Sequence, residues 1–291
     1  MSLLTENTDF IGIDIGTSSI RLVQLKGSGG VRSLVKYALV PIDSKLSLSD
    51  APADVQKLAA VIKDLIAQTK PTTKNVAVGL PTNKVFTTIV DIEKLSAGEL
   101  AKTIELQADT LIPTPIDESK IDWSVLGTSP VDPTKVEVLL ASIPNEYIEK
   151  RLDMLENLGL NVIAFEPDSL AMARAVIPAD VTTPILTVDM GDLSTDIVIV
   201  SGGGPRLIRS IPTGTDAIIK AAVQNLNIDE KQAEQFVYKF GLSKDKLEGQ
   251  INNAIIGTVD ILVTEIEKSI KYYRSRYPEI PLDRIIVIGG A

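Results

Sequence analysis

The sequence predicts an α/β fold made of two related lobes, and three observations support this prediction. Short apolar segments of strand length alternate with amphipathic helical segments along the chain, as in α/β proteins. A strand–turn–strand unit with the pattern Asp-x-Gly occurs twice, at Asp14-x-Gly16 and at Asp189-x-Gly191. The copies lie 175 residues apart in a chain of 291 residues, which is long enough for two domains of about 100–200 residues each.

The expected elements follow from apolar periodicity, turn residues and helix caps. Ser96 followed by Glu99 is a capping-box pattern at the start of a helix, and Gly159 is a typical helix-ending residue. In chain order we expect a hairpin over 10–25, a helix after Pro52, strands 75–80 and 85–90, a helix from 96 to 111, strands 121–126 and 136–143, a helix from 145 to 158, a strand 161–165, a helix 171–176, strands 185–188 and 196–200, helices between 217 and 274 broken near 241 and 249, and a strand 284–288.

The composition limits the possible chemistry, because the chain contains no cysteine and no histidine. Disulfides and thiol chemistry are excluded, and the commonest general base and transition-metal ligand is missing. Any chemistry therefore depends on carboxylates, hydroxyls, backbone amides and lysine, with Mg²⁺ as the expected ion. The formal net charge of −9 makes nucleic acids and anionic membranes poor partners, although a local basic patch is compatible with it.

Two features predict a cytoplasmic protein. No apolar run approaches the roughly 18–20 residues that cross a bilayer. Residues 1–9 contain neither the basic segment nor the apolar stretch of a signal peptide, so we expect no leader and no anchor in this chain.

Each Asp-x-Gly turn has the residues of a phosphate-binding hairpin. Glycine lets backbone N–H groups approach a phosphate, small hydroxyl residues add donors, and an aspartate at a strand end suits hydrated Mg²⁺. Two such turns facing each other would bind a polyphosphate from both sides. One copy alone is equally compatible with an ordinary hairpin turn, but the repeat favours the functional interpretation.

The order of the motifs resembles the five-motif ATPase core of the actin, sugar kinase and heat-shock chaperone superfamily. Those motifs are Asp14-x-Gly16, Glu166 before an alanine-rich helix, Asp189-x-Gly191 and the terminal Gly289-Gly290. The segment between the first two motifs is similar to the PilM family of type IV pilus assembly proteins. The matching pieces are Val76–Pro81, Glu99–Ile104, Ile112-Pro113, Asp122–Leu126, Val136–Leu140, Leu158–Leu160 and Glu166–Ala171.

The resemblance implies an actin-like, ribonuclease H-like duplicated fold of two lobes with an inserted α+β subdomain. Its implied segments are the start of the first lobe (1–29), the inserted subdomain with the rest of that lobe (30–165), a connecting helix (166–180) and the second lobe (181–291). In the superfamily a helix, a strand and a terminal helix follow the adenosine-binding turn. The chain is therefore expected to be truncated at its C-terminus by roughly 50 residues.

The resemblance also implies a site for ATP and Mg²⁺. Asp14 and Asp189 match the positions that hold the metal, and Glu166 matches the position that orients the attacking water, so these three form the implied catalytic set. The other implied nucleotide contacts are Gly16, Thr17, Ser18, Gly191, Ser194, Thr195 and Gly214 for the phosphates, and Glu265, Lys268, Gly289 and Gly290 for the adenosine and α-phosphate.

Four of these positions also have a structural interpretation. Glu166 is compatible with a surface turn, Glu265 and Lys268 with a surface ion pair, and the turn 213–216 with a helix cap. Arg21 lies where pilus homologues often carry lysine, and packing on a strand is as compatible with it as a phosphate contact.

The resemblance implies an ATP-binding platform protein of type IV pilus assembly with at most slow ATPase activity. PilM-like proteins lie at the cytoplasmic face of the inner membrane and bind the N-terminal cytoplasmic peptide of the membrane protein PilN. We therefore expect a PilN-like partner that is captured as an extended peptide by residues 30–165, membrane attachment only through that partner, and a possible homo-oligomer.

Two other functions fit the same superfamily. A cell-division filament protein of the FtsA type shares the inserted subdomain. A sugar kinase would need a catalytic aspartate near the second turn, where Asp192 and Asp196 are available. Polymerisation with ATP would favour the filament protein, and phosphate transfer to a sugar would favour the kinase.

Overall fold

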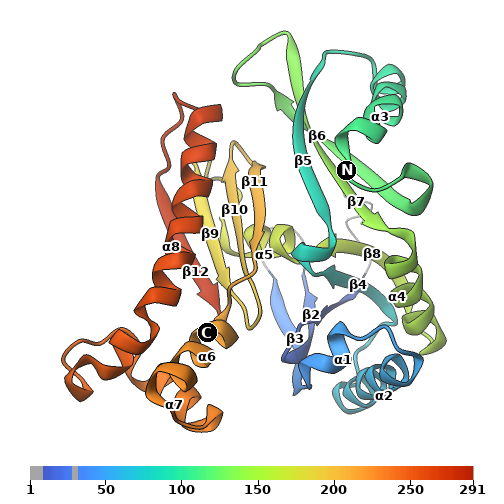
Figure 1. The fold of residues 1–291 in the computed structure, drawn as a ribbon. Coiled ribbons are helices and arrows are strands. Elements are labelled where there is room, and N and C mark those ends of the chain that lie inside the picture. Colours follow the sequence, from blue (N-terminus) through green and yellow to red (C-terminus); the bar gives the residue numbers. More distant parts are fainter. Residues whose placement is uncertain (1–8, 28–31, 291) are drawn as a thin grey trace. The chain divides into compact units, whose positions relative to one another are not determined.

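The computed structural model describes residues 9–27 and 32–290 and divides the chain into two compact units, Met1–Ala175 and Val176–Ala291 (Figure 1). Among the described residues, the first unit contains a five-stranded and a three-stranded sheet and the second unit a four-stranded sheet, and each unit has its own apolar core. The glycine-rich segment 27–30, in which the sequence also predicts a turn, falls largely outside the described residues. None of the helices within these ranges combines the length and the apolarity that crossing a membrane requires.

The first unit is built on a five-stranded sheet with the order β3-β2-β1-β4-β8. Strands β1, β2 and β3 form an antiparallel meander, whereas β1, β4 and β8 run parallel. Helices α2 and α4 contribute Leu58, Ile62 and Leu155 to the core beneath the sheet. The bounds are β1 (Ile11–Ile15), β2 (Ser19–Lys26), β3 (Ser33–Pro41), α1 (Ser44–Leu48), α2 (Pro52–Thr69), β4 (Asn75–Leu80), α4 (Asn145–Asn157) and β8 (Asn161–Pro167).

A second, three-stranded antiparallel sheet is inserted in the sequence between β4 and α4, with the order β5-β7-β6. Helix α3 packs on this sheet through Leu100 and Ile104 against Val138 and Leu140. The predicted capping box at its start is present, because the Ser96 hydroxyl accepts from the backbone of Glu99 while the Glu99 carboxylate accepts from the backbone of Ser96. The bounds are β5 (Phe86–Glu93), α3 (Ala97–Leu111), β6 (Ser119–Thr128) and β7 (Lys135–Pro144).

The second unit has a four-stranded sheet with the order β11-β10-β9-β12. Helix α8 covers it, and Tyr273 and Tyr277 are fully buried with ring centroids 5.0 Å apart. Helices α6, α7 and α8 form a second small core. The bounds, beginning with the helix that precedes this unit, are α5 (Asp168–Val176), β9 (Ile185–Met190), β10 (Thr195–Ser201), β11 (Gly204–Ile211), α6 (Thr215–Leu226), α7 (Glu230–Phe240), α8 (Gln250–Arg276) and β12 (Arg284–Gly289).

The five-stranded sheet of the first unit and the four-stranded sheet of the second unit repeat one arrangement of strands, which confirms the predicted α/β fold of two related lobes. In the first unit β1 pairs antiparallel with β2 and parallel with β4. In the second unit β9 pairs antiparallel with β10 and parallel with β12. Strands β3 and β11 then occupy the same edge of each sheet.

Some elements were not expected from the sequence. Strand β3 was not predicted, because apolar residues lie on both of its faces. Tyr37 and Leu39 are exposed, so the sequence lacks the alternation of apolar and polar residues that usually marks a strand. The short helix α1 was also missed. The helical stretch after residue 217 has an additional break at Asn227, which ends α6 in the left-handed conformation with φ of 52°.

Replacing the cap of α3 tests the capping box. The substitution Ser96→Ala removes the acceptor for the first helical turn, so we expect the free energy of unfolding to fall by about 1 kcal/mol. Urea denaturation followed by circular dichroism measures this change. Lys102→Ala, an exposed change in the same helix, is the control and should have little effect. An equal loss in both variants would contradict a specific capping role.

Two adjacent glycines provide a matched test of backbone approach. A Cβ at Gly289 would lie 2.2 Å from the Met190 carbonyl oxygen, and this residue has φ of +126°. A Cβ at Gly290 would meet nothing within 4 Å. We therefore expect Gly289→Ala to lower the free energy of unfolding by about 2 kcal/mol or more, and Gly290→Ala to change it by less than about 0.5 kcal/mol. Thermal and urea melts of the two variants, compared with the unaltered chain, check this difference.

Candidate functional site

The first Asp-x-Gly turn joins β1 to β2 in a tight hairpin. The Gly16 N–H donates to the Ser19 carbonyl oxygen at 3.0 Å, and the Ser18 carbonyl accepts from the Ile42 N–H at 3.0 Å. The Thr17 and Ser18 hydroxyls have no hydrogen-bond partner among residues 9–27 and 32–290. The turn therefore presents two hydroxyls, as predicted for a phosphate-binding hairpin.

Asp14 is already paired in this hairpin. Arg21 lies directly opposite Asp14 on β2, and its Nη1 is 2.8 Å from the Asp14 Oδ2. The same nitrogen would lie 3.4 Å from a Cβ at Gly16, so the guanidinium extends beside the turn. The structure thus places a fixed cation next to the carboxylate that was predicted to hold Mg²⁺.

Glu166 and Asp14 lie at the same end of the five-stranded sheet, near the carboxyl ends of their parallel strands. Strands β1 and β8 flank β4 and run parallel with it, and Asp14 and Glu166 follow the residues that align with Val78 of β4. Both oxygens of the Glu166 carboxylate accept from Arg174 on α5: Oε2 from Nη2 at 2.5 Å, and Oε1 from Nη1. This bond raises the pKa of Arg174 above its ordinary value. Glu166 is therefore held in a bidentate pair that occupies the carboxylate.

The second Asp-x-Gly turn repeats the hydrogen bond of the first. The Gly191 N–H donates to the Ser194 carbonyl oxygen at 2.9 Å. The Ser194 hydroxyl has no hydrogen-bond partner in the described part of the chain. Thr195 is different, because it is fully buried and its hydroxyl donates to the Thr213 carbonyl at 2.7 Å. Its side chain therefore stabilises the neighbouring loop, in place of the free hydroxyl that the sequence suggested.

The start of α6 lies directly against this second turn. The Thr215 N–H donates to the Gly191 carbonyl at 3.0 Å, and the Asp216 N–H donates to the Asp192 carbonyl at 2.9 Å. Gly214 is the N-cap residue of α6, and a Cβ there would lie 2.4 Å from the Asp192 carbonyl oxygen. Only glycine allows this approach, so Gly214 both caps the helix and joins it to the turn.

Gly289 brings the end of β12 against the same turn. It aligns with Met190 in the parallel pairing of β12 with β9, and it contacts the Met190 backbone too closely for any side chain. Gly290 is the next residue, and a Cβ added there would meet no atom within 4 Å. The second turn, the start of α6 and the end of β12 therefore meet backbone to backbone at Gly214 and Gly289, where no side chain intervenes.

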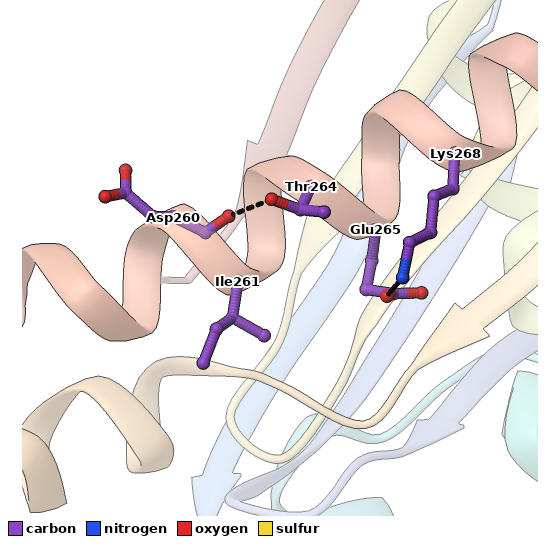
Figure 2. A pocket seen from close by; sticks show the side chains of 5 residues that line it. All are labelled: Asp260, Ile261, Thr264, Glu265 and Lys268. Atoms are coloured by element: carbon purple, nitrogen blue, oxygen red, sulfur yellow. Dashed lines mark hydrogen bonds and ion pairs between the residues drawn. The ribbon is translucent and has the colours of Figure 1, made fainter.

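Glu265 and Lys268 face one side of α8, where they line a surface hollow of about 300 Å³ with Asp260, Ile261 and Thr264 (Figure 2). Glu265 accepts from Lys268 at 2.6 Å and from Arg209 of β11 at 2.6 Å. The hydrogen bond from Lys268, and next that from Arg209, lowers the pKa of Glu265. Arg209 stands two residues before Ile211, which pairs with Thr195, so β11 connects this hollow to the second turn.

The predicted residues therefore form one cluster in each unit. Asp14, Gly16, Thr17, Ser18 and Glu166 lie at one sheet edge of the first unit. The cluster of the second unit comprises Asp189, Gly191, Ser194, Thr195, Gly214, Gly289 and Gly290, with Glu265 and Lys268 reached through β11.

The residues suit a polyphosphate better than they suit a metal bound by protein alone. Bare backbone and unpaired hydroxyls at the turns fit phosphate oxygens. Within the described residues, no group of three or more acidic side chains is placed to hold a metal ion. Mg²⁺ would therefore depend on Asp14 or Asp189 together with water and the phosphates of the nucleotide, which is its usual mode of binding.

Two arginines of this region were not predicted from the sequence. Arg174 lies eight residues after Glu166, and Arg209 is one of several polar residues on β11. No local motif indicates either contact, because each depends on how a helix packs beside a strand. For Arg21 the sequence left packing on a strand and a phosphate contact open, and the structure pairs its guanidinium with Asp14.

Comparison with solved structures shows the fold. The chain is similar to a structure described as the "PilM-PilN type IV pilus biogenesis complex", with a TM-score of 0.81, 22% sequence identity and coverage of 97% of this chain and 82% of that chain. It is also similar to MreB5 of Spiroplasma citri bound to ADP (TM-score 0.58, 15% identity, 98% and 86% coverage). The ethanolamine utilization protein EutJ from Carboxydothermus hydrogenoformans gives a TM-score of 0.57 with 16% identity and coverage of 98% and 78%. The predicted actin-like ATPase fold with an inserted subdomain is thus confirmed.

A family model named for the type IV pilus assembly protein PilM matches residues 12–291, nearly the whole chain. The match includes both Asp-x-Gly turns, the inserted sheet and the final Gly289-Gly290. The chain belongs to the PilM family of type IV pilus assembly proteins.

Proposed function

We propose that this protein is a nucleotide-responsive adaptor of type IV pilus assembly, which binds ATP with Mg²⁺ and the N-terminal cytoplasmic peptide of a PilN-like membrane protein. The observation that carries the nucleotide half of this proposal is the repeated turn. Gly16 and Gly191 each close the same hydrogen bond, at 3.0 and 2.9 Å, after an aspartate at the end of a buried strand. Each turn carries a hydroxyl without a hydrogen-bond partner among the described residues, and such a hydroxyl suits contact with a phosphate oxygen.

The second unit adds the features that would bind the rest of the nucleotide. Gly214 and Gly289 remove side chains where the backbones of α6 and β12 approach the turn. Glu265 is held from two sides by Lys268 and Arg209, so its carboxylate has a fixed position from which to accept a ribose hydroxyl. We assign the adenosine to this face of α8 and the phosphates to the turns.

Slow hydrolysis follows from the state of Glu166. Both oxygens of Glu166 accept from Arg174, and the cation held beside the carboxylate weakens it as a base toward an attacking water. ATP in this protein would accordingly act as a ligand that shifts a conformational equilibrium, with turnover secondary to binding.

The inserted sheet of the first unit is the proposed partner surface. Its edge strands are β5 and β6, and β5 pairs with β7 over its full length without a bulge. An extended peptide can add to such an edge through backbone hydrogen bonds, with side-chain pockets setting specificity. The similar solved structure is a PilM–PilN complex, and membership of the same family supports a PilN-like partner here. Such a partner would place the protein at the cytoplasmic face of the inner membrane.

A peptide titration tests the adaptor function. The probe is a fluorescent synthetic peptide that copies the N-terminal cytoplasmic tail of the host's PilN-like protein. We expect saturable binding whose affinity changes at least about threefold when Mg²⁺ and ATP are added, because a nucleotide that favours one conformation alters the affinity of any ligand selective for it. A peptide of scrambled sequence is the control. Absence of binding under both conditions would remove the pilus-adaptor function, and sedimentation with ATP would then test filament formation.

A pair of substitutions on α8 tests the adenosine site. Glu265→Ala removes the fixed carboxylate, so we expect ATP affinity to fall by about tenfold while the affinity for inorganic tripolyphosphate stays unchanged, because a neutral-to-charged hydrogen bond is worth about 1.5–3 kcal/mol. Isothermal titration calorimetry with both ligands measures this. Glu267→Ala, an exposed glutamate of the same helix, is the matched control. Equal ATP binding by both variants would show that the adenosine lies elsewhere.

A further inference from the structure

The two Asp-x-Gly turns can be compared residue by residue. Their cross-strand pairs correspond, since Asp14 lies opposite Arg21 and Asp189 lies opposite Asp196. The closing hydrogen bonds correspond as well, from Gly16 to Ser19 and from Gly191 to Ser194. Asp192 of the second turn therefore stands at the position of Thr17 in the first.

The two turns, although they correspond in position, differ in net charge. Residues 14–21 contain one aspartate and one arginine, and the two are paired at 2.8 Å. Residues 189–196 contain three aspartates and no basic residue. Residues 14–21 are thus formally neutral, whereas residues 189–196 carry three formal negative charges, of which Asp192 lies in the turn itself.

Asp192 is fixed at the tip of the second turn. Its carbonyl accepts from the Asp216 N–H at 2.9 Å, and the close approach of Gly214 holds the loop against α6. No hydrogen bond or ion pair to the Asp192 carboxylate is present among the residues that the structure describes. The ammonium of Lys220, whose charge acts on Asp192, is bound to Asp216 at 2.7 Å.

The surroundings of Asp192 disfavour additional negative charge. Burial raises the pKa of Asp192 above its ordinary value, and the carboxylates of Asp216 and, more weakly, Glu234 of α7 raise it further, against an opposing effect of Lys220. The carboxylate of Asp216 lies in the first turn of α6, at the positive end of the helix dipole where an incoming phosphate would otherwise gain stabilisation. A free phosphate at this turn would therefore meet a like charge with little compensation.

We infer that Asp192 makes the second turn selective for the divalent-cation complex of a nucleotide and excludes the metal-free nucleotide. A cation shared between the carboxylate and a phosphate oxygen turns the repulsion into attraction, whereas a metal-free phosphate meets the carboxylate directly. The inference rests on the nucleotide binding proposed above and adds a specificity-determining residue to it. The corresponding Thr17 cannot act in this way, because it carries a neutral hydroxyl.

The test measures ATP affinity of the full chain by isothermal titration calorimetry, with Mg²⁺ and, separately, with EDTA. For the unaltered protein we expect binding without metal to be at least about tenfold weaker than binding with Mg²⁺. Asp192→Asn keeps the shape and removes the charge, so metal-free affinity should rise at least about fivefold. Asp192→Thr, which copies the first turn, should give the same rise if the charge alone is responsible.

The control is Asp245→Asn, which removes one negative charge from the same unit at a side chain that is 78% exposed. It should behave like the unaltered protein, and thermal melts should show that every variant is folded. If Asp192→Asn and the unaltered protein bind metal-free ATP equally, or if the unaltered protein binds equally with and without Mg²⁺, the inference is wrong while nucleotide binding stands. If the unaltered protein binds no ATP even with Mg²⁺, the proposed nucleotide binding and this inference both fail.

Discussion

The close approach of backbone to backbone at the second turn is the constraint on which the rest of this structure depends. The start of α6, the end of β12 and the turn between β9 and β10 meet where Gly214 and Gly289 leave no room for a Cβ. Three segments far apart in the sequence are thereby joined through main-chain atoms. The result is a concentration of polar backbone without side chains, which is costly unless its N–H and C=O groups find partners among themselves or in a ligand. The hydrogen bonds from Thr215 and Asp216 to the turn satisfy part of this need.

Charge is distributed unevenly around the two turns. In the first unit each predicted acidic residue is matched by an arginine, as Asp14 is by Arg21 and Glu166 is by Arg174. The bidentate pair of Glu166 with Arg174 has the geometry in which an ion pair contributes to stability even when it is partly exposed. In the second unit the acids around Asp192 outnumber the basic residues near them. The two related lobes have thus acquired turns with different electrostatic surroundings.

The inserted sheet shows how one unit can acquire a second role. It has its own core around Val138 and Leu140 and its own capped helix α3, so it is formed by local packing. Its place between β4 and α4 leaves the five-stranded sheet intact, because both of those elements still pack in the core of the unit. A partner surface on the insert is therefore free to change in sequence while the core of the five-stranded sheet stays the same. The insert follows Leu80 at the carboxyl end of β4, which is the same end of the sheet at which Asp14 precedes its turn.

The sequence by itself determined the α/β class, the duplication, the capped start of α3 and the family, because each of these depends on local patterns: apolar periodicity, short turn motifs and caps. It also located both turns and the glycines beside them. It did not predict β3, whose apolar residues lie on both faces, it left the roles of Arg21 and Glu166 open, and it assigned Thr195 to a phosphate. Only the tertiary structure decided those roles: Arg21 and Arg174 occupy the carboxylates of Asp14 and Glu166, and the hydroxyl of Thr195 is used by the Thr213 carbonyl. The physical reason is that a side chain's partner depends on the packing of segments distant in sequence, whereas the pattern that forms a strand or a turn lies within a few neighbouring residues.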